Sequence, residues 1–152
     1  MIGMTNELVQ KIGEKISNNF LGVFPSDVLL DQIEEMKKRK KWSTIVNLSP
    51  SSQSGSHFVA IVRNEGQLFY FDSFGFSPYQ KYVVKTINDL MQDQVSIYFW
   101  PRQIQSFHSD MCGFFTLFFI STERENQMFH LNNLRMNDLI CFHGVQDILS
   151  KL

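Results

Sequence analysis

The strongest constraint on the fold is an apolar run of ten residues, Met111–Ile120, with the sequence MCGFFTLFFI. The run is about half the ~20 residues that a membrane-spanning helix needs, so it predicts a helix buried in a protein core. The opening segment, MIGMTNELVQKIGEKI, alternates apolar and charged residues and therefore differs from the apolar core of a signal peptide. We expect a soluble, intracellular protein with no membrane segment, in a reducing compartment.

Short helical and extended segments make up the rest of the chain. Hydrophobic spacing and turn residues predict helices at 7–19, 26–41 and 77–93, the last opened by Ser77-Pro78, and strands at 42–48, 57–63, 67–75 and 95–101. The segment 20–25, FLGVFP, is expected to be an interruption between the first two helices, and residues 49–56 are expected to form a surface loop. Two short helical pieces, 136–144 and 145–152, are expected at the end.

This order of elements predicts one domain, residues 1–152, of the α+β class. A chain of 152 residues with 43% hydrophobic residues can bury a single core. Because strands and helices neither alternate strictly nor segregate, we expect a small mixed, mostly antiparallel sheet packed against helices. The net charge of −1 gives no global attraction to nucleic acid or to acidic membranes.

Cys112 stands where the predicted buried helix begins. A thiol reacts as its thiolate, which the unpaired amides and dipole of a helix N-terminus favour. Ser109 or Asp110 would cap this helix, Gly113 would let a substrate approach, and the Cys112 amide could face an oxyanion. The alternative is a small buried hydrophobe. With Cys141 as the only other cysteine, no disulfide scaffold is expected.

His57 and Asp72 fall at the same end of the predicted hairpin of strands 57–63 and 67–75, because antiparallel neighbours run in opposite directions. The carboxylate could accept from one imidazole nitrogen and leave the other for a thiol proton. Each residue also has an ordinary alternative. His57 could be a surface histidine, and Asp72 could form the turn before SFG.

Gln105 lies seven residues before Cys112 and could donate its side-chain amide to an oxyanion, although Gln103 is an alternative donor. His108 could act as the base or bind a metal, but His57 is preferred and no second paired ligand cluster accompanies it, so no metal site is expected. Base, orienter, amide donor and nucleophile together cover the roles that a cysteine hydrolase needs.

The order His, Asp, Gln, Cys, with the segments GSHFVAIV, YFDSFGFS and QSFHSDMCG, resembles the adenovirus maturation protease (adenain) and its clan. The clan also contains the proteases that remove small ubiquitin-like modifiers. The resemblance covers roughly residues 20–122, and this compact chain resembles the short versions of the family that occur in other large DNA viruses, virophages and virus-like transposons. Adenovirus enzymes usually carry Trp and Glu where this chain has Phe58 and Asp72. Asp is the usual choice elsewhere in the clan.

The resemblance implies an adenain-like fold and a cysteine endopeptidase that forms a thioester. Cys112 would be the nucleophile, His57 the base and then the acid, and Asp72 its orienter, while Gln105 and the Cys112 amide would form the oxyanion hole. Gly55, Phe58 and Gly113 would contact substrate. The substrates implied are virion precursor proteins cut at glycine-containing sites, in host cytoplasm or nucleus at sites of virus assembly, or within the virion.

The resemblance also implies activation by DNA or a peptide, with no prosthetic group required. Adenain's activating peptide forms a disulfide upstream of the oxyanion glutamine, but residues 91–105 contain no cysteine and Cys141 does not match. The basic run Lys37, Lys38, Arg39, Lys40 and Lys41 could bind DNA weakly, although a solvated helix end is the preferred interpretation.

Three other functions stay open at this point. The same site could serve a deconjugase for ubiquitin-like proteins, although Phe58 in place of a tryptophan lid and the Gln-to-Cys spacing favour the endopeptidase. It could also serve an acyltransferase that uses acetyl-CoA, or the chain could be an inactive binding module. We expect a monomer that acts on protein substrates.

Overall fold

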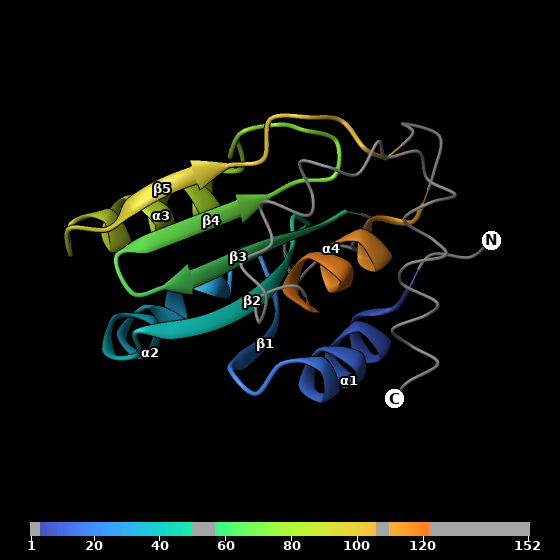
Figure 1. The fold of residues 1–152 in the computed structure, drawn as a ribbon, viewed down its shortest axis with the longest axis horizontal. Coiled ribbons are helices and arrows are strands. Elements are labelled where there is room, and N and C mark those ends of the chain that lie inside the picture. The colour runs from blue at the N-terminus through green and yellow to red at the C-terminus, as the bar shows by residue number, and fades with distance from the viewer. Residues whose placement is uncertain (1–3, 50–56, 106–109, 122–152) are drawn as a thin grey trace.

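The computed structural model describes residues 4–49, 57–105 and 110–121, which form three layers with a five-stranded sheet in the middle (Figure 1). The strands lie side by side in chain order. They are β1 (Phe20–Pro25), β2 (Lys41–Asn47), β3 (Phe58–Asn64), β4 (Gln67–Phe71) and β5 (Ser96–Phe99). The α+β class and the mixed sheet predicted from the sequence are confirmed.

Parallel and antiparallel pairings are equally frequent in this sheet. β2 with β3 and β3 with β4 are antiparallel, whereas β1 with β2 and β4 with β5 are parallel. Each parallel pair is joined by a connection long enough to hold a helix, as parallel strands require. The sheet is therefore a central antiparallel unit with one parallel strand added at each edge.

Helices cover both faces of the sheet. On one face, α1 (Asn6–Ile16) and α4 (Cys112–Ser121) pack against each other and onto β1 and β3. On the other face, the 3₁₀-helix η1 (Leu29–Gln32) packs with α2 (Ile33–Lys38) and α3 (Lys81–Met91). The first six residues of β3 are buried because both of its faces are covered, which explains the continuous apolar run in the sequence.

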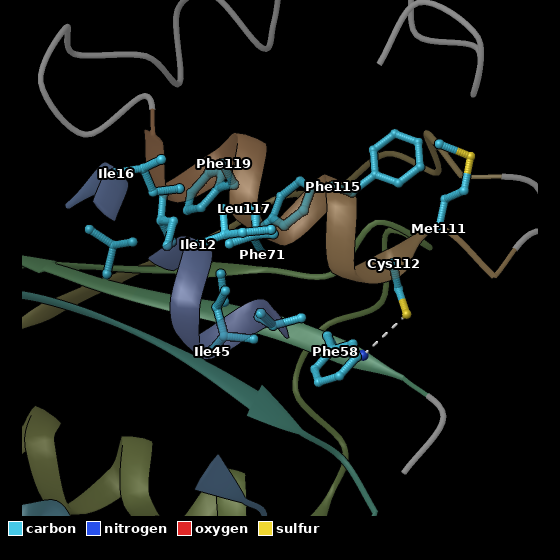
Figure 2. Close-up of a cluster of buried hydrophobic side chains, with 14 of the residues drawn as sticks. Ile12, Ile16, Ile45, Phe58, Phe71, Met111, Cys112, Phe115, Leu117 and Phe119 are labelled. Carbon is cyan, nitrogen blue, oxygen red and sulfur yellow. Dashed lines mark hydrogen bonds between the residues drawn. The ribbon is translucent and has the colours of Figure 1, made fainter. Parts of the chain in front are cut away.

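Helix α4 contains nearly all of the apolar run Met111–Ile120. Figure 2 shows Phe115, Leu117 and Phe119 directed into a cluster of side chains from α1 and the sheet. Phe119 stacks on Phe71 of β4, with ring centroids 4.6 Å apart. Because full burial of one such side chain contributes ~1.5–3 kcal/mol, this packing fixes the helix, and with it Cys112, on the sheet.

Some sequence boundaries were wrong. Residues 20–25, expected as a break, form edge strand β1, because they pair in parallel with β2, an interaction between distant segments. Gly22 has a φ of 140° at the point where the register with β2 shifts. The helix expected at 26–41 starts at Leu29 and ends at Lys38, because β2 begins at Lys41.

The helix expected at 77–93 begins at Lys81 rather than at Ser77-Pro78. Gln80 caps it, since its side-chain oxygen accepts hydrogen bonds from the backbone N–H groups of Tyr82 and Val83 at 2.8 and 3.0 Å. The helices expected at 136–144 and 145–152 lie outside the described residues. In the part of the chain that is described, every helix is too short or too polar to cross a membrane.

Candidate active site

Cys112 is the first residue of α4, and its side chain is directed at the start of β3 (Figure 2). It is 4% exposed, and its sulfur accepts a hydrogen bond from the backbone N–H of Phe58 at 3.4 Å. An amide donor and a helix N-terminus both favour a negative charge on the sulfur. The structure therefore places this thiol in surroundings that suit a thiolate.

His57 directly precedes β3 and lies against Asp72, which directly follows β4. The distance between His57 Nε2 and Asp72 Oδ1 is 2.8 Å, and the carboxylate is fully buried while the imidazole is 13% exposed. An ionised carboxylate only accepts hydrogen bonds, so Nε2 carries the donating proton. Nδ1 is then the nitrogen left for the hydrogen bond between His57 and Cys112, so the three side chains interact in the sequence Asp72, His57, Cys112.

The turn after β4 holds both members of this pair. Asp72 Oδ1 also accepts from the backbone N–H of Phe74 at 2.8 Å, and the Phe74 ring stacks on the imidazole with centroids 4.5 Å apart and an interplanar angle of 12°. Asp72 Oδ2 is buried and has no hydrogen-bond partner within the described residues. The charge of the carboxylate is therefore compensated mainly through Oδ1, which favours a positive imidazole beside it.

Electrostatics at His57 point the same way. Burial by itself lowers the pKa of His57, but hydrogen bonds to Asp72 and Cys112, together with the charges of both groups, outweigh it and raise the pKa from 6.5 to about 9. The imidazole is then protonated at neutral pH. A positive imidazolium beside the Cys112 sulfur favours a thiolate–imidazolium pair, the ground state of an activated cysteine nucleophile.

Gln105 is 1% exposed and is held by Ser73, the residue after Asp72. The Ser73 hydroxyl donates a short hydrogen bond to Gln105 Oε1, and the Ser73 carbonyl accepts from the backbone N–H groups of Ile104 and Gln105 at 2.8 and 3.0 Å. Gln103 is exposed, and its side-chain amide donates to the Gln105 carbonyl at 3.0 Å. Of the two candidate donors, Gln105 is thus the one built into the interior.

Phe58 and Gly113 have packing contacts in the structure, while their substrate-binding role stays a prediction. Phe58 is 4% exposed and belongs to the core below α4. A side-chain carbon at Gly113 would lie 3.2 Å from Met4 Cβ, so this glycine lets the segment before α1 pack closely on α4. Gly55, His108, Ser109 and Cys141, which the sequence analysis considered, lie outside the described residues.

The described residues bring a candidate nucleophile, Cys112, and a candidate base, His57, together. Within residues 4–49, 57–105 and 110–121, no group of three or more His, Cys, Asp or Glu side chains is arranged to hold a metal ion. Cys112 takes part in no disulfide within this part of the chain and is buried. The arrangement can therefore support attack by sulfur on a carbonyl carbon, with proton transfer through the neighbouring imidazole.

Ser73, Phe74 and Gly75 also belong to the site, although no sequence pattern assigned any of them a role there. They follow Asp72 in the motif FDSFG. The turn signal of Ser and Gly after a strand was visible, but the contact of this turn with residues 102–105 joins segments about thirty residues apart and no local pattern encodes it.

Comparisons with known proteins support the fold. No protein-family model matches the sequence, and no curated protein matches it. The crystal structure of the ASFV protease matches with a TM-score of 0.72 at 18% identity, over 92% of this chain and 64% of that one. The central domain of Lpg1148 from Legionella pneumophila matches with 0.58 at 14% identity, over 84% and 78% of the two chains.

AvrA, solved with IP6 and CoA, matches with a TM-score of 0.52 at 20% identity, over 80% of this chain and 49% of that one. The described chain thus spans less than two thirds of the ASFV protease and about half of AvrA. At these identities the likeness shows the fold alone, and this chain has the α+β fold of the ASFV protease.

Proposed function

We propose that this chain is a cysteine endopeptidase whose catalytic residues are Cys112, His57, Asp72 and Gln105. The proposal rests chiefly on one observation: a buried Asp72 carboxylate 2.8 Å from His57, whose imidazole interacts with a thiol at the N-terminus of a buried helix. The likeness of the fold to a viral protease supports it.

Acylation begins with the thiolate of Cys112 attacking the carbonyl carbon of the scissile peptide, which moves the C=O electron pair onto oxygen. The tetrahedral intermediate collapses, and the amine leaves with the proton that His57 held at Nδ1. A thioester and a neutral imidazole remain. Asp72 keeps the ring oriented through Nε2 and stabilises its charged form.

Deacylation reverses the proton's path. Neutral His57 takes a proton from water, the hydroxide attacks the thioester carbonyl, and the Cys112 thiolate leaves, restoring the ion pair. In both steps the backbone N–H of Cys112 and the side-chain NH₂ of Gln105 donate to the oxyanion. Preorganised donors of this kind supply a large share of the rate enhancement in acyl transfer.

The substrates proposed are viral precursor proteins cleaved at glycine-containing sites, at places of virus assembly in the host cell or inside the virion. The resemblance to adenain and the fold match to the ASFV protease support this choice of class. A small P1 or P2 residue such as glycine suits a site in which the nucleophile itself is only 4% exposed, because little room is left around the sulfur.

Acyl transfer from acetyl-CoA is the second candidate, because AvrA, a fold match, was solved with CoA. The chemistry needs no change in the site: Cys112 would take the acetyl group as a thioester, and a lysine amine of the acceptor protein would replace water. An acetyl adduct of Cys112, detected by mass spectrometry after exposure to acetyl-CoA, would favour this alternative.

The first test is brief alkylation with iodoacetamide at about pH 6, compared between the wild-type chain and His57→Ala. An ordinary thiol has a pKa of about 8.5 and reacts slowly at that pH. We expect rapid, His57-dependent labelling of Cys112, located by peptide mass, with Cys141 as an internal reference. Equal slow labelling in both proteins would contradict an assembled nucleophile.

The second test gives the wild-type chain and Cys112→Ala peptides that contain internal Gly-Gly or Gly-Ala bonds, a fluorogenic ubiquitin-like substrate and acetyl-CoA. Cleavage of internal bonds that requires Cys112 supports the endopeptidase. Release of the fluorescent group from the ubiquitin-like substrate, without cleavage of the internal peptide bonds, would instead indicate a deconjugase. The absence of any Cys112-dependent product with all three reagents, despite rapid alkylation, would overturn the proposal of peptide-bond hydrolysis.

A further inference from the structure

The turn Asp72–Gly75 contacts both His57, the proposed base, and the loop that carries Gln105, the proposed oxyanion donor. Its first residue, Asp72, holds His57 through Oδ1, and its carbonyl accepts from the backbone N–H of Gly75 at 2.8 Å. Its second residue, Ser73, is fully buried and faces the loop that carries Gln105. One four-residue turn thus links the base to the proposed oxyanion donor.

Ser73 makes three hydrogen bonds with that loop. Its carbonyl accepts from the N–H groups of Ile104 and Gln105, and its hydroxyl donates to the side-chain oxygen of Gln105. The backbone bonds set where residue 105 lies. The hydroxyl bond sets which way its amide faces, because a primary amide carries an acceptor at one end and donors at the other.

We propose that Ser73 is a positioning residue that holds Gln105 with its NH₂ group, rather than its carbonyl oxygen, toward the oxyanion. This inference rests on the proposed acyl-transfer function. If the amide turned over, a partial negative charge would face the developing negative charge, and stabilisation would become repulsion. By occupying Oε1 with a donated hydrogen bond, the hydroxyl favours the productive orientation before substrate arrives.

Gly75 supports the same arrangement through the backbone. It has a φ of 79°, and a side-chain carbon there would lie 2.5 Å from the Arg102 carbonyl carbon and 2.7 Å from the Gln103 nitrogen. The turn and the loop therefore touch backbone to backbone, which brings Ser73 within hydrogen-bonding distance of Gln105. The alternative is that Ser73 merely satisfies a buried hydroxyl and has no influence on catalysis.

A double-mutant cycle on Ser73 and Gln105 distinguishes these possibilities. The variants are Ser73→Ala, Gln105→Ala and the double substitution, assayed for kcat and KM on a glycine-containing peptide that the wild-type chain cleaves. We expect Ser73→Ala to lower kcat by ~10- to 100-fold with little change in KM, less than the ~10²–10³-fold loss expected when the donor itself is removed. In the Gln105→Ala background, Ser73→Ala should change kcat by less than about twofold, because its effect acts through Gln105.

Two further variants guard against an effect of folding alone. Ser73→Thr keeps the hydroxyl and should restore most of the activity, whereas Ser73→Cys keeps the size with a weaker donor and should fall between Ser and Ala. If a thermal melt shows that Ser73→Ala is not folded, the Thr and Cys variants test the same positioning role. The alkylation rate of Cys112, which needs no oxyanion donor, should equal that of the wild-type chain in every folded variant.

Unchanged kcat in Ser73→Ala, or losses that multiply in the double variant, would overturn the positioning role while leaving the endopeptidase intact. A wild-type chain that neither labels rapidly at Cys112 nor cleaves peptides would instead overturn the proposed function. The two failures are therefore distinguishable.

Discussion

The two parts of the candidate site are held in different ways. His57 directly precedes β3 and Asp72 directly follows β4, so the antiparallel pairing of these two strands puts both residues at the same end of the hairpin. Gln105 lies on an irregular segment whose residues 104 and 105 make three hydrogen bonds with Ser73. We call these the strand part and the loop part of the site. The strand part is secured by a sheet, whereas the loop part is secured by a few polar contacts.

This difference predicts that the two parts fail separately. A change in the strand part should remove the activation of the thiol, which alkylation of Cys112 detects. A change in the loop part should leave the thiol reactive and slow only the steps that pass through an oxyanion. Each substitution below can therefore be scored by two measurements, peptide cleavage and thiol alkylation.

The largest effect is expected from Asp72→Asn. The asparagine amide is neutral, so it cannot both accept a hydrogen bond from Nε2 and compensate a positive imidazole. His57 then loses its orientation and its positive charge. As a result, kcat/KM should fall by ~10⁴-fold. Alkylation of Cys112 near pH 6 should slow as well. The control Asp31→Asn changes an exposed carboxylate on η1 and should leave both rates unaltered. Full alkylation with lost cleavage would show that Asp72 does not act through activation of the Cys112 thiol.

Gln105→Ala should have the next largest effect, a loss of ~10²–10³-fold in kcat, because one oxyanion donor is removed. The alkylation rate of Cys112 should stay at the wild-type value. The matched variant Gln103→Ala removes an exposed amide two residues away and should cost much less. A larger loss in Gln103→Ala than in Gln105→Ala would reverse the assignment of the donor.

Gly75→Ala should lower the free energy of unfolding by ~1–3 kcal/mol, because alanine is strained at a φ of 79°. The added carbon also meets the Arg102 backbone at 2.5 Å, so the loop must move away from Ser73 and kcat should fall. Urea denaturation and peptide cleavage measure the two effects. The control is Gly66→Ala in the β3–β4 turn, where an added carbon meets nothing within 4 Å and little change is expected. Equal stability of the two variants would contradict the close packing at Gly75.

The same contrast explains what could be predicted from the sequence. The pairing of His57 with Asp72 follows from two apolar strands and a short turn, since antiparallel register is a local consequence of the hairpin. The contact of Ser73 with Gln105 joins two irregular segments whose conformations depend on tertiary packing, so spacing alone did not reveal it. Strand β1 was missed for a related reason: FLGVFP becomes a strand by pairing with β2.

Cys112 lies between these cases. Its place at the start of a helix was predictable from the apolar run that follows, and its role as a nucleophile was suggested by the resemblance to adenain. The hydrogen bond from the Phe58 backbone to its sulfur could not be predicted, because it depends on how α4 is seated across β3. The start of this helix was thus predictable, while its contact with β3 was not.

The titration of His57 tests the strand part more finely. Its pKa should be about 9 in the wild-type chain, lower in Cys112→Ala, and lowest when Asp72→Asn is added, because both neighbours raise it. NMR of the imidazole protons follows this directly. In the Cys112→Ala protein no thiol titrates at this site, so the pH dependence of stability at this site reports on the His57–Asp72 pair.

The sign of that dependence follows from the direction of the shift. A histidine whose folded-state pKa exceeds its ordinary value of 6.5 stabilises the fold fully below about pH 6.5 and loses this contribution as pH rises through its folded-state pKa. In Cys112→Ala, the free energy of unfolding should therefore decline above pH 6.5, and the decline should be shallower once Asp72→Asn is added. A flat profile would contradict the buried ion pair.

The smallest effect is expected from the basic run Lys37–Lys41, which extends from the end of α2 to the first residue of β2. Helix α2 packs on the sheet face opposite α4, so charges at its end lie away from both parts of the site (Figure 1). Arg39 is already paired with Glu35 at 2.7 Å. Changing Lys38, Lys40 and Lys41 to Gln should therefore alter kcat/KM by less than about twofold, as expected for exposed surface positions.

Addition of duplex DNA to the cleavage assay makes this prediction sharper. We expect the same kcat for the wild-type chain and the triple variant, with and without DNA, at about 0.15 M salt. If DNA raised the activity of the wild-type chain alone, and less so as salt increased, the run would be an activating polyanion site. Such a result would mean that α2 is coupled through the sheet to the strand part or to the loop part of the site. The alkylation rate of Cys112 would then tell which part responds to DNA, because only the strand part controls the reactivity of the thiol.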